Sequence, residues 1–145
     1  LKKTIELNPK NANALNHLGY LYAERGIKLD EAIVAINKAL EVDPNNGYYL
    51  DSLGWAYFKR GKNYEALNLI EKALSIVPED PVILDHLGDI YFQLDKINKA
   101  KQAWEKSLKI KSDDNQVREK LEKVEKMLRE NKQAHDCQKR KDALE

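Results

Sequence analysis

The 145-residue chain has little of several features that would place it in a functional class. A single cysteine excludes an intramolecular disulfide and leaves the redox compartment open. A net charge of +1 argues against nucleic acid as the main partner, because phosphate binding needs a clustered basic surface. No apolar run approaches the roughly 20 residues of a membrane span, so none is expected.

Signatures of catalysis are missing as well. The sequence shows no glycine-rich phosphate loop, nucleophile elbow or metal-ligand run, so we expect no enzyme activity, no cofactor and no metal site. The run His135-Asp136-Cys137 holds three potential ligands but would bind a metal only loosely. His17 and His86 recur at equivalent repeat positions, which favours a place on the surface or at a seam between repeats.

The chain does contain an internal repeat with a period of about 34 residues. A Leu-Gly pair with a tyrosine three residues later is followed by an alanine, and each unit closes on a proline. The recurring residues are Gly19, Gly54 and Gly88, Tyr22, Tyr57 and Tyr91, Ala32, Ala66 and Ala100, and Pro9, Pro44 and Pro78. This period is typical of stacked helical hairpins, because one hairpin cannot bury its apolar face alone.

These positions resemble the signature of the tetratricopeptide repeat family, whose unit is two antiparallel helices. The best match lies in residues 47–80 and consists of Leu50, Leu53-Gly54, Tyr57, Gly61, Ala66, Ile70, Ala73 and Pro78. The resemblance implies an all-α, right-handed helical-hairpin solenoid. Its expected parts are the end of a preceding repeat at 1–11, repeats at 12–46, 47–80 and 81–114, and a capping helix with a charged tail at 115–145.

Physical patterns support the same helices. The spacing of Leu50, Leu53 and Tyr57 forms one stripe of a helix, and the other two units repeat it. Asp80-Pro81 suits a helix N-cap followed by the first helical residue. Mid-helix glycines are costly, so their recurrence predicts close approach of a neighbouring helix. We expect helices at about 12–25, 30–42, 47–60, 64–76, 81–94 and 97–110, with a helical stub at 1–7.

The segment after residue 112 has a different pattern. Val117, Leu121, Val124 and Leu128 form a narrow apolar stripe on an otherwise charged helix. This favours a helix that caps the last repeat, with a short coiled-coil seam as the alternative. Beyond Glu130 the pattern fades, which favours a solvated end over a helix extended against another chain. Leu144-Glu145 could be native or a cloning remnant.

In the tetratricopeptide repeat family the concave face is lined chiefly by the first helix of each unit. Carried over to this chain, the expected partner-binding groove consists of Asn13, Asn16, Tyr20, Glu24, Tyr48, Asp51, Trp55, Phe58, Lys59, Asp85, Asp89 and Phe92. Such an aromatic strip rimmed by carboxylates suits a peptide or helix with apolar anchors and some basic residues.

Packing is the alternative for several of these side chains. Trp55 is the preferred ligand contact, and Trp55→Ala would then weaken binding and leave the fold intact. Phe58 and Phe92 could pack between repeats, Tyr48 could cover a seam, and the aspartates could form a solvated face. Trp104 is expected in the core.

The family's carboxylate clamp for chaperone C-termini needs basic residues that this chain lacks. Its positions hold Asn16, Asp51 and Asp85, then Tyr20, Trp55 and Asp89, so we argue against that type of adaptor.

The expected function is therefore a protein–protein interaction scaffold, without catalysis. The repeats look like the C-terminal units of larger bacterial repeat proteins, so a fragment of such a scaffold is expected. The alternatives are a self-assembly module that dimerises through the open N-terminal repeat face or the C-terminal helix, and a targeting arm of a larger enzyme. The compartment, cytoplasmic or periplasmic, stays open because an N-terminal targeting segment could be missing.

Overall fold

The computed structural model describes residues 11–144, and all regular secondary structure in this range is α-helical. The helices are α2 (Ala12–Arg25), α3 (Leu29–Val42), α4 (Gly47–Lys59), α5 (Asn63–Ile76), α6 (Pro81–Gln93), α7 (Ile97–Ile110) and α8 (Asn115–Leu144). The expectation of an all-α repeat fold is confirmed. The stub at 1–7, most of the leading partial repeat and Glu145 lie outside the described residues.

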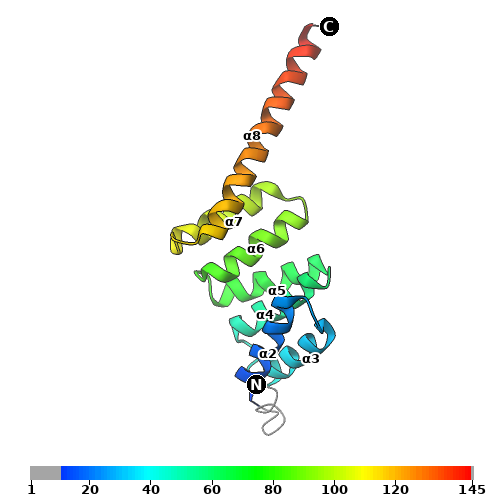
Figure 1. Ribbon diagram of the computed structural model, residues 1–145, viewed down its shortest axis with the longest axis vertical. Coiled ribbons are helices and arrows are strands. Elements are labelled where there is room, and N and C mark those ends of the chain that lie inside the picture. Colours follow the sequence, from blue (N-terminus) through cyan, green and yellow to red (C-terminus); the bar gives the residue numbers. More distant parts are fainter. Residues whose placement is uncertain (1–10, 145) are drawn as a thin grey trace.

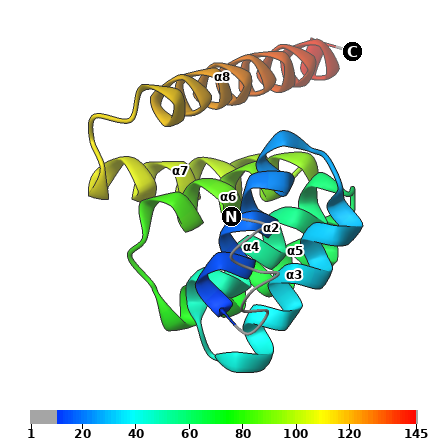
Figure 2. The same cartoon turned by 60° about the horizontal axis from the view of Figure 1, so that its bottom comes forward.

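The helices form three stacked hairpins, α2/α3, α4/α5 and α6/α7, followed by α8 (Figures 1 and 2). Within the stack α2 contacts α4 and α4 contacts α6 directly, whereas α3, α5 and α7 make no comparable contact with one another. The first helices of successive units therefore lie closer together than the second helices do. The stack therefore has an inner face made by the first helices and an outer face made by the second helices.

Side-chain caps start the first helix of each unit. Asn11 and Asn46 accept backbone N–H groups at the beginnings of α2 and α4. Asp80 caps α6 by accepting from the N–H groups of the second and third helical residues at 2.9 and 3.0 Å, with Pro81 at the first helical position, as the sequence predicts. Asp114 caps α8 in the same way. These bonds satisfy N–H groups that have no partner within the helix.

The turn inside each hairpin needs a left-handed residue. Gly26 and Gly61 have φ values of 66° and 86° there, and Asp95 takes the equivalent position of the third unit with a φ of 60°. Aspartate tolerates this region better than most residues, which explains how the third unit departs from glycine without changing the turn. Between this turn glycine and the alanine of the second helix the first unit has one residue more than the second, and Lys28 in this longer turn has a φ of 50°.

The recurrent mid-helix glycines mark close helix packing, as expected. A Cβ atom at Gly88 would lie 2.3 Å from Nε1 of Trp104, and one at Gly54 would lie 2.9 Å from Cδ1 of Ile70. Ala32, Ala66 and Ala100 are fully buried at the facing positions of the second helices. The glycines thus allow the two helices of each hairpin to pack closely. The free energy gained from this packing offsets the low helix propensity of glycine.

Helix α8 has two halves with different surroundings. In the first half Val117 and Val124 are buried in a cluster with Ala100 and Trp104, which confirms a packed capping helix. In the second half every side chain from residue 129 to residue 144 is exposed, and the helix projects beyond the repeats (Figure 1). The side chains of this end are solvated, as expected, and they belong to a continuous helix that the fading apolar pattern did not predict.

Candidate partner-binding surface

The residues expected to line the groove fall into three groups by exposure. Asn13, Glu24, Tyr48 and Lys59 are exposed, with Tyr48 at 55%. Two others, Asp51 and Trp55, are buried. The half-buried members of the set are Asn16, Tyr20, Phe58, Asp85, Asp89 and Phe92. All twelve lie on the first helices α2, α4 and α6, but they do not form one open surface.

Trp55 is a core residue of the seam between α4 and α6. It is 5% exposed, and its ring stacks on the His86 ring at a centroid distance of 4.0 Å and on Phe58 at 5.0 Å. The Lys59 ammonium lies 4.9 Å from the Trp55 ring centroid. Trp55 therefore packs between units, and its expected role as an open ligand contact is corrected to that of a support beneath the inner face.

A buried ion pair lies next to this stack. His86 Nδ1 and Asp51 Oδ1 are 2.8 Å apart, and both side chains are less than a tenth exposed. Burial lowers the pKa of His86, but the Asp51 carboxylate, with smaller contributions from Asp85 and Asp89, raises it by more, so the pKa lies above its usual value. The expected seam position of His86 is confirmed, while Asp51 is not a free groove carboxylate.

A second ion cluster joins α6 to α8. Lys120 Nζ donates to Asp85 Oδ1 at 3.0 Å and to Asp89 Oδ1 at 2.9 Å. Trp104 Nε1 also donates to Asp85 Oδ1 at 3.0 Å, and the expected core position of Trp104 is confirmed at 3% exposure. Burial raises the pKa of Asp89 despite the opposing effect of Lys120. The two carboxylates expected on the acidic rim, Asp85 and Asp89, thus share one lysine of the same chain.

The two clusters are related by the repeat. Asp51 pairs with His86, and Asp85 pairs with Lys120, so each acid meets a base 35 residues later. Lys120 stands in α8 at the position that His86 occupies in α6. Helix α8 therefore continues the register of the first helices, and its lysine completes the seam that the preceding unit completes with a histidine.

Two buried side-chain atoms within the described residues have no hydrogen-bond partner: Asn16 Oδ1 and Trp55 Nε1. Asn16 occupies the repeat position of Asp51 and Asp85, so the first seam lacks the ion pair of the other two. Tyr49 instead links α4 to α2 through a hydrogen bond between its hydroxyl and Asn13 Oδ1. An unpartnered buried polar atom is uncommon in a folded protein, and both of these lie on the first helices.

The exposed part of the inner face has few charged side chains and several aromatic ones. Tyr20 lies beside Glu24, and its pKa is raised by burial, by a hydrogen bond to Glu24 and by nearby carboxylates. Phe92 lies 6.0 Å from Trp104 between ring centroids and stays partly exposed. With the aspartates paired, Glu24 and Lys59 are the exposed charges among the expected groove residues.

The sequence reasoning missed Lys120 as a residue of this face. The signal was present as the recurring 35-residue interval between an acid and a base, but a lysine in a charged helix does not stand out. Among residues 11–144 no group of acidic, histidine or cysteine side chains could hold a metal ion. Within the same residues no helix combines the length and apolarity needed to cross a bilayer.

Family models of known proteins match most of the chain. The family model described as anaphase-promoting complex, cyclosome, subunit 3 matches residues 25–107, and a tetratricopeptide repeat model matches residues 1–34. No curated protein sequence gives a match.

Among solved structures, the first repeat domain of Spaghetti (RPAP3), bound to the HSP90 peptide SRMEEVD, is 26% identical. It aligns with a TM-score of 0.73 over 81% of this chain and 92% of that one. The first repeat domain of human RPAP3 is 25% identical, with a TM-score of 0.76 over 87% and 98% of the two chains. The Sgt2 domain of Aspergillus fumigatus, at 23% identity and a TM-score of 0.76 over 84% and 82%, shows the shared fold alone. The chain belongs to the tetratricopeptide repeat family.

Proposed function

We propose that this chain is a non-catalytic scaffold that holds a peptide or a helix of a partner protein against its inner face. The observation that carries the proposal is the inner face of α2, α4 and α6, on which Tyr20, Phe58 and Phe92 are partly exposed. Aromatic side chains at the centre of a protein interface supply most of its binding free energy. Exposed Asn13, Tyr48 and Lys59 would form the polar rim.

The internal ion pairs limit which kinds of partner side chain the inner face could bind. Because Asp51, Asp85 and Asp89 are already paired, a basic partner residue would find only Glu24 free among the expected groove carboxylates. Apolar anchors are therefore proposed to dominate recognition. A relative binds the acidic peptide SRMEEVD, but Lys59 is the one exposed cation among the expected groove residues here, so we propose a different partner class.

Site-specific photo-cross-linking tests this proposal. A photoreactive phenylalanine analogue would replace Tyr48 on α4 or, as the matched control, Tyr64 on α5, which is 65% exposed on a second helix. We expect the inner-face position to capture a protein from a lysate of the source cells and the outer position to leave it uncaptured. Capture from Tyr64 alone, or from neither position, would contradict binding at the inner face.

Self-association is a second candidate, and one observation favours it. A groove of about 340 Å³ lies on the first unit between α2 and α3, lined by Leu15, Leu18, Tyr22 and Val34 among others, and Val34 is 54% exposed. A second copy could cover this apolar surface. Light scattering that shows only monomer over a wide concentration range would remove this candidate.

A further inference from the structure

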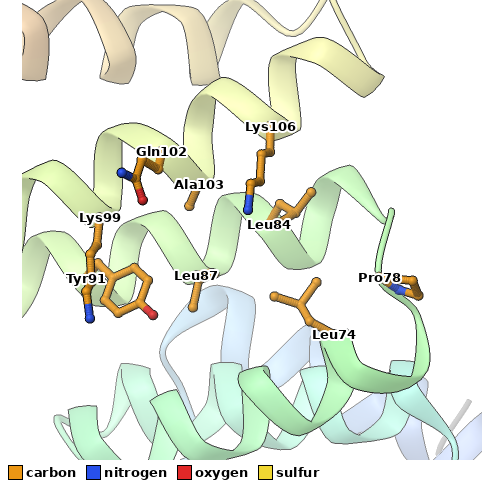
Figure 3. Close-up of a pocket in the computed structure, with 9 residues that line it drawn as sticks. All are labelled: Leu74, Pro78, Leu84, Leu87, Tyr91, Lys99, Gln102, Ala103 and Lys106. Atoms are coloured by element: carbon orange, nitrogen blue, oxygen red, sulfur yellow. The ribbon is translucent and has the colours of Figure 1, made fainter.

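The outer face of the third unit carries a groove that differs from the inner face in its chemistry. It lies between the end of α5 and the α6/α7 hairpin and has a volume of about 330 Å³. Its floor and walls include Leu74, Leu84, Leu87 and Ala103, and its rim is made by Lys99 and Lys106 of α7 (Figure 3). A second hollow of about 450 Å³ shares Leu84 and Lys106 with it and extends it toward the exposed Ile110.

One substitution between repeats explains why the groove is open. Ala103 stands at the repeat position that Leu69 occupies in the second unit. Leu69 is partly buried and packs against the core clusters around Ile70 and Trp55. Replacing a leucine by an alanine at this position leaves the space of several carbon atoms. The third unit therefore has a cavity where the second unit has a packed side chain.

The charge of the rim is particular to the third unit, whereas the first unit also has an alanine, Ala35, at the position of Ala103 and an open groove beside it. Lys99 stands where the first and second units have Glu31 and Glu65. Residues 96–111, which comprise α7 and its flanking caps, hold six lysines and one glutamate. Neither Lys99 nor Lys106 takes part in an ion pair among the side chains of residues 11–144. Two carboxylates are nearby, Glu71 facing Tyr91 and Glu79 bordering the extension, so lysine stays in excess.

The spacing of the rim lysines indicates the shape of an occupant. Lys99 and Lys106 are seven residues apart in α7, which is about 10 Å along a helix. We propose that this outer groove binds an acidic amphipathic helix of a partner protein. Carboxylates two turns apart on that helix would pair with Lys99 and Lys106, and an apolar side chain between them would enter the space above Ala103. This groove uses none of the twelve residues expected to line the inner face.

A designed peptide tests the proposal directly. The probe is a fluorescent amphipathic helical peptide with glutamates every seven residues beside a stripe of leucines, and the control probe has lysines in place of those glutamates. We expect saturable binding of the glutamate peptide, weakened by salt, and none of the lysine peptide. Equal binding of both peptides, or failure of the glutamate peptide to bind, would overturn the proposal.

Two variants locate the binding on the protein. Lys106→Glu should weaken binding about tenfold or more, whereas Lys38→Glu, at the same repeat position in the first unit, should leave it unchanged. Ala103→Leu should abolish binding without changing charge, and Leu69 at the equivalent position shows that the repeat accommodates this side chain. Circular dichroism would check that each variant is folded. Equal loss in the two lysine variants, or full binding by Ala103→Leu, would place the peptide elsewhere.

Discussion

The seam between α4 and α6 and the seam between α6 and α8 each contain a paired aspartate, but the base that pairs with it differs. Each places an aspartate of one first helix against a base of the next, 35 residues later. His86 is almost fully buried with Asp51, while the Lys120 side chain is 35% exposed beside Asp85 and Asp89. The comparison teaches that one repeat position can carry either a buried, titratable pair or a partly solvated, permanent one. The interior seam depends more on its partners than the terminal one does.

The largest effect is expected from removing the aromatic ring over the interior seam. Trp55→Ala should lower the free energy of unfolding by about 3–5 kcal/mol, because it leaves a cavity between units and uncovers His86. Urea unfolding measures this loss. Tyr48→Ala, on the same helix but exposed, is the control and should change stability by less than about 0.5 kcal/mol. A Trp55→Ala protein as stable as the wild type would mean that Trp55 lies on the open surface and not in the seam.

Removing the acid of the interior seam should have the next largest effect. Asp51→Ala leaves a buried His86 without its carboxylate and should cost about 3 kcal/mol or more. A double-mutant cycle with His86→Ala measures the pair itself, and the double variant should lose less than the two single losses combined. Strict additivity would mean that the two side chains do not interact.

Raising the pH should weaken the interior seam by less than the loss of Asp51, because a neutral imidazole can still donate to the carboxylate. The pKa of His86 is raised in the folded protein, so its contribution is complete below the unfolded pKa of about 6.5 and is lost as pH rises through the folded value. Stability measured from pH 6 upward should fall in the wild type and fall less in His86→Gln. Parallel curves for the two proteins would contradict this assignment.

The terminal seam should give the smallest effect. Lys120→Met keeps the length of the side chain and should cost about 1 kcal/mol, because the ion cluster is partly solvated. Added salt should reduce the difference between this variant and the wild type. Lys123→Met, an exposed neighbour on α8, is the matched control. A loss as large as that of Asp51→Ala would mean that the two seams are equivalent after all.

The fold could be predicted because its signals are local and repeated. The stripe through Leu50, Leu53 and Tyr57, the glycine at Gly54 and the cap at Asp80 each act within one helix or one hairpin, and the structure has them as expected. The capping role of α8 followed from Val117 and Val124 in the same way. Its continuation to Leu144 could not be predicted from apolar spacing, because the exposed half has no stripe to follow.

The candidate site was predicted less well than the fold. The repeat assigns Trp55 and Asp51 to the first helices correctly, but the exposure of a side chain depends on what the next unit places against it. His86 covers both residues, and Lys120 reaches back to Asp85 and Asp89 from a helix that follows the last repeat. Contacts across 35 residues are set by how units stack, which the residues of one unit do not reveal.

The sequence by itself determined the helical hairpins, their period and the family, because apolar spacing, small residues at close contacts and capping residues act over one or two turns. The tertiary structure alone decided which charged side chains form ion pairs within the chain and which do not. The aspartates of the inner face are paired by the next helix, while Lys99 and Lys106 on the outer face are left over an open apolar groove. The physical reason is that a charge is free or paired according to its neighbours in space, and stacking brings those neighbours from other units.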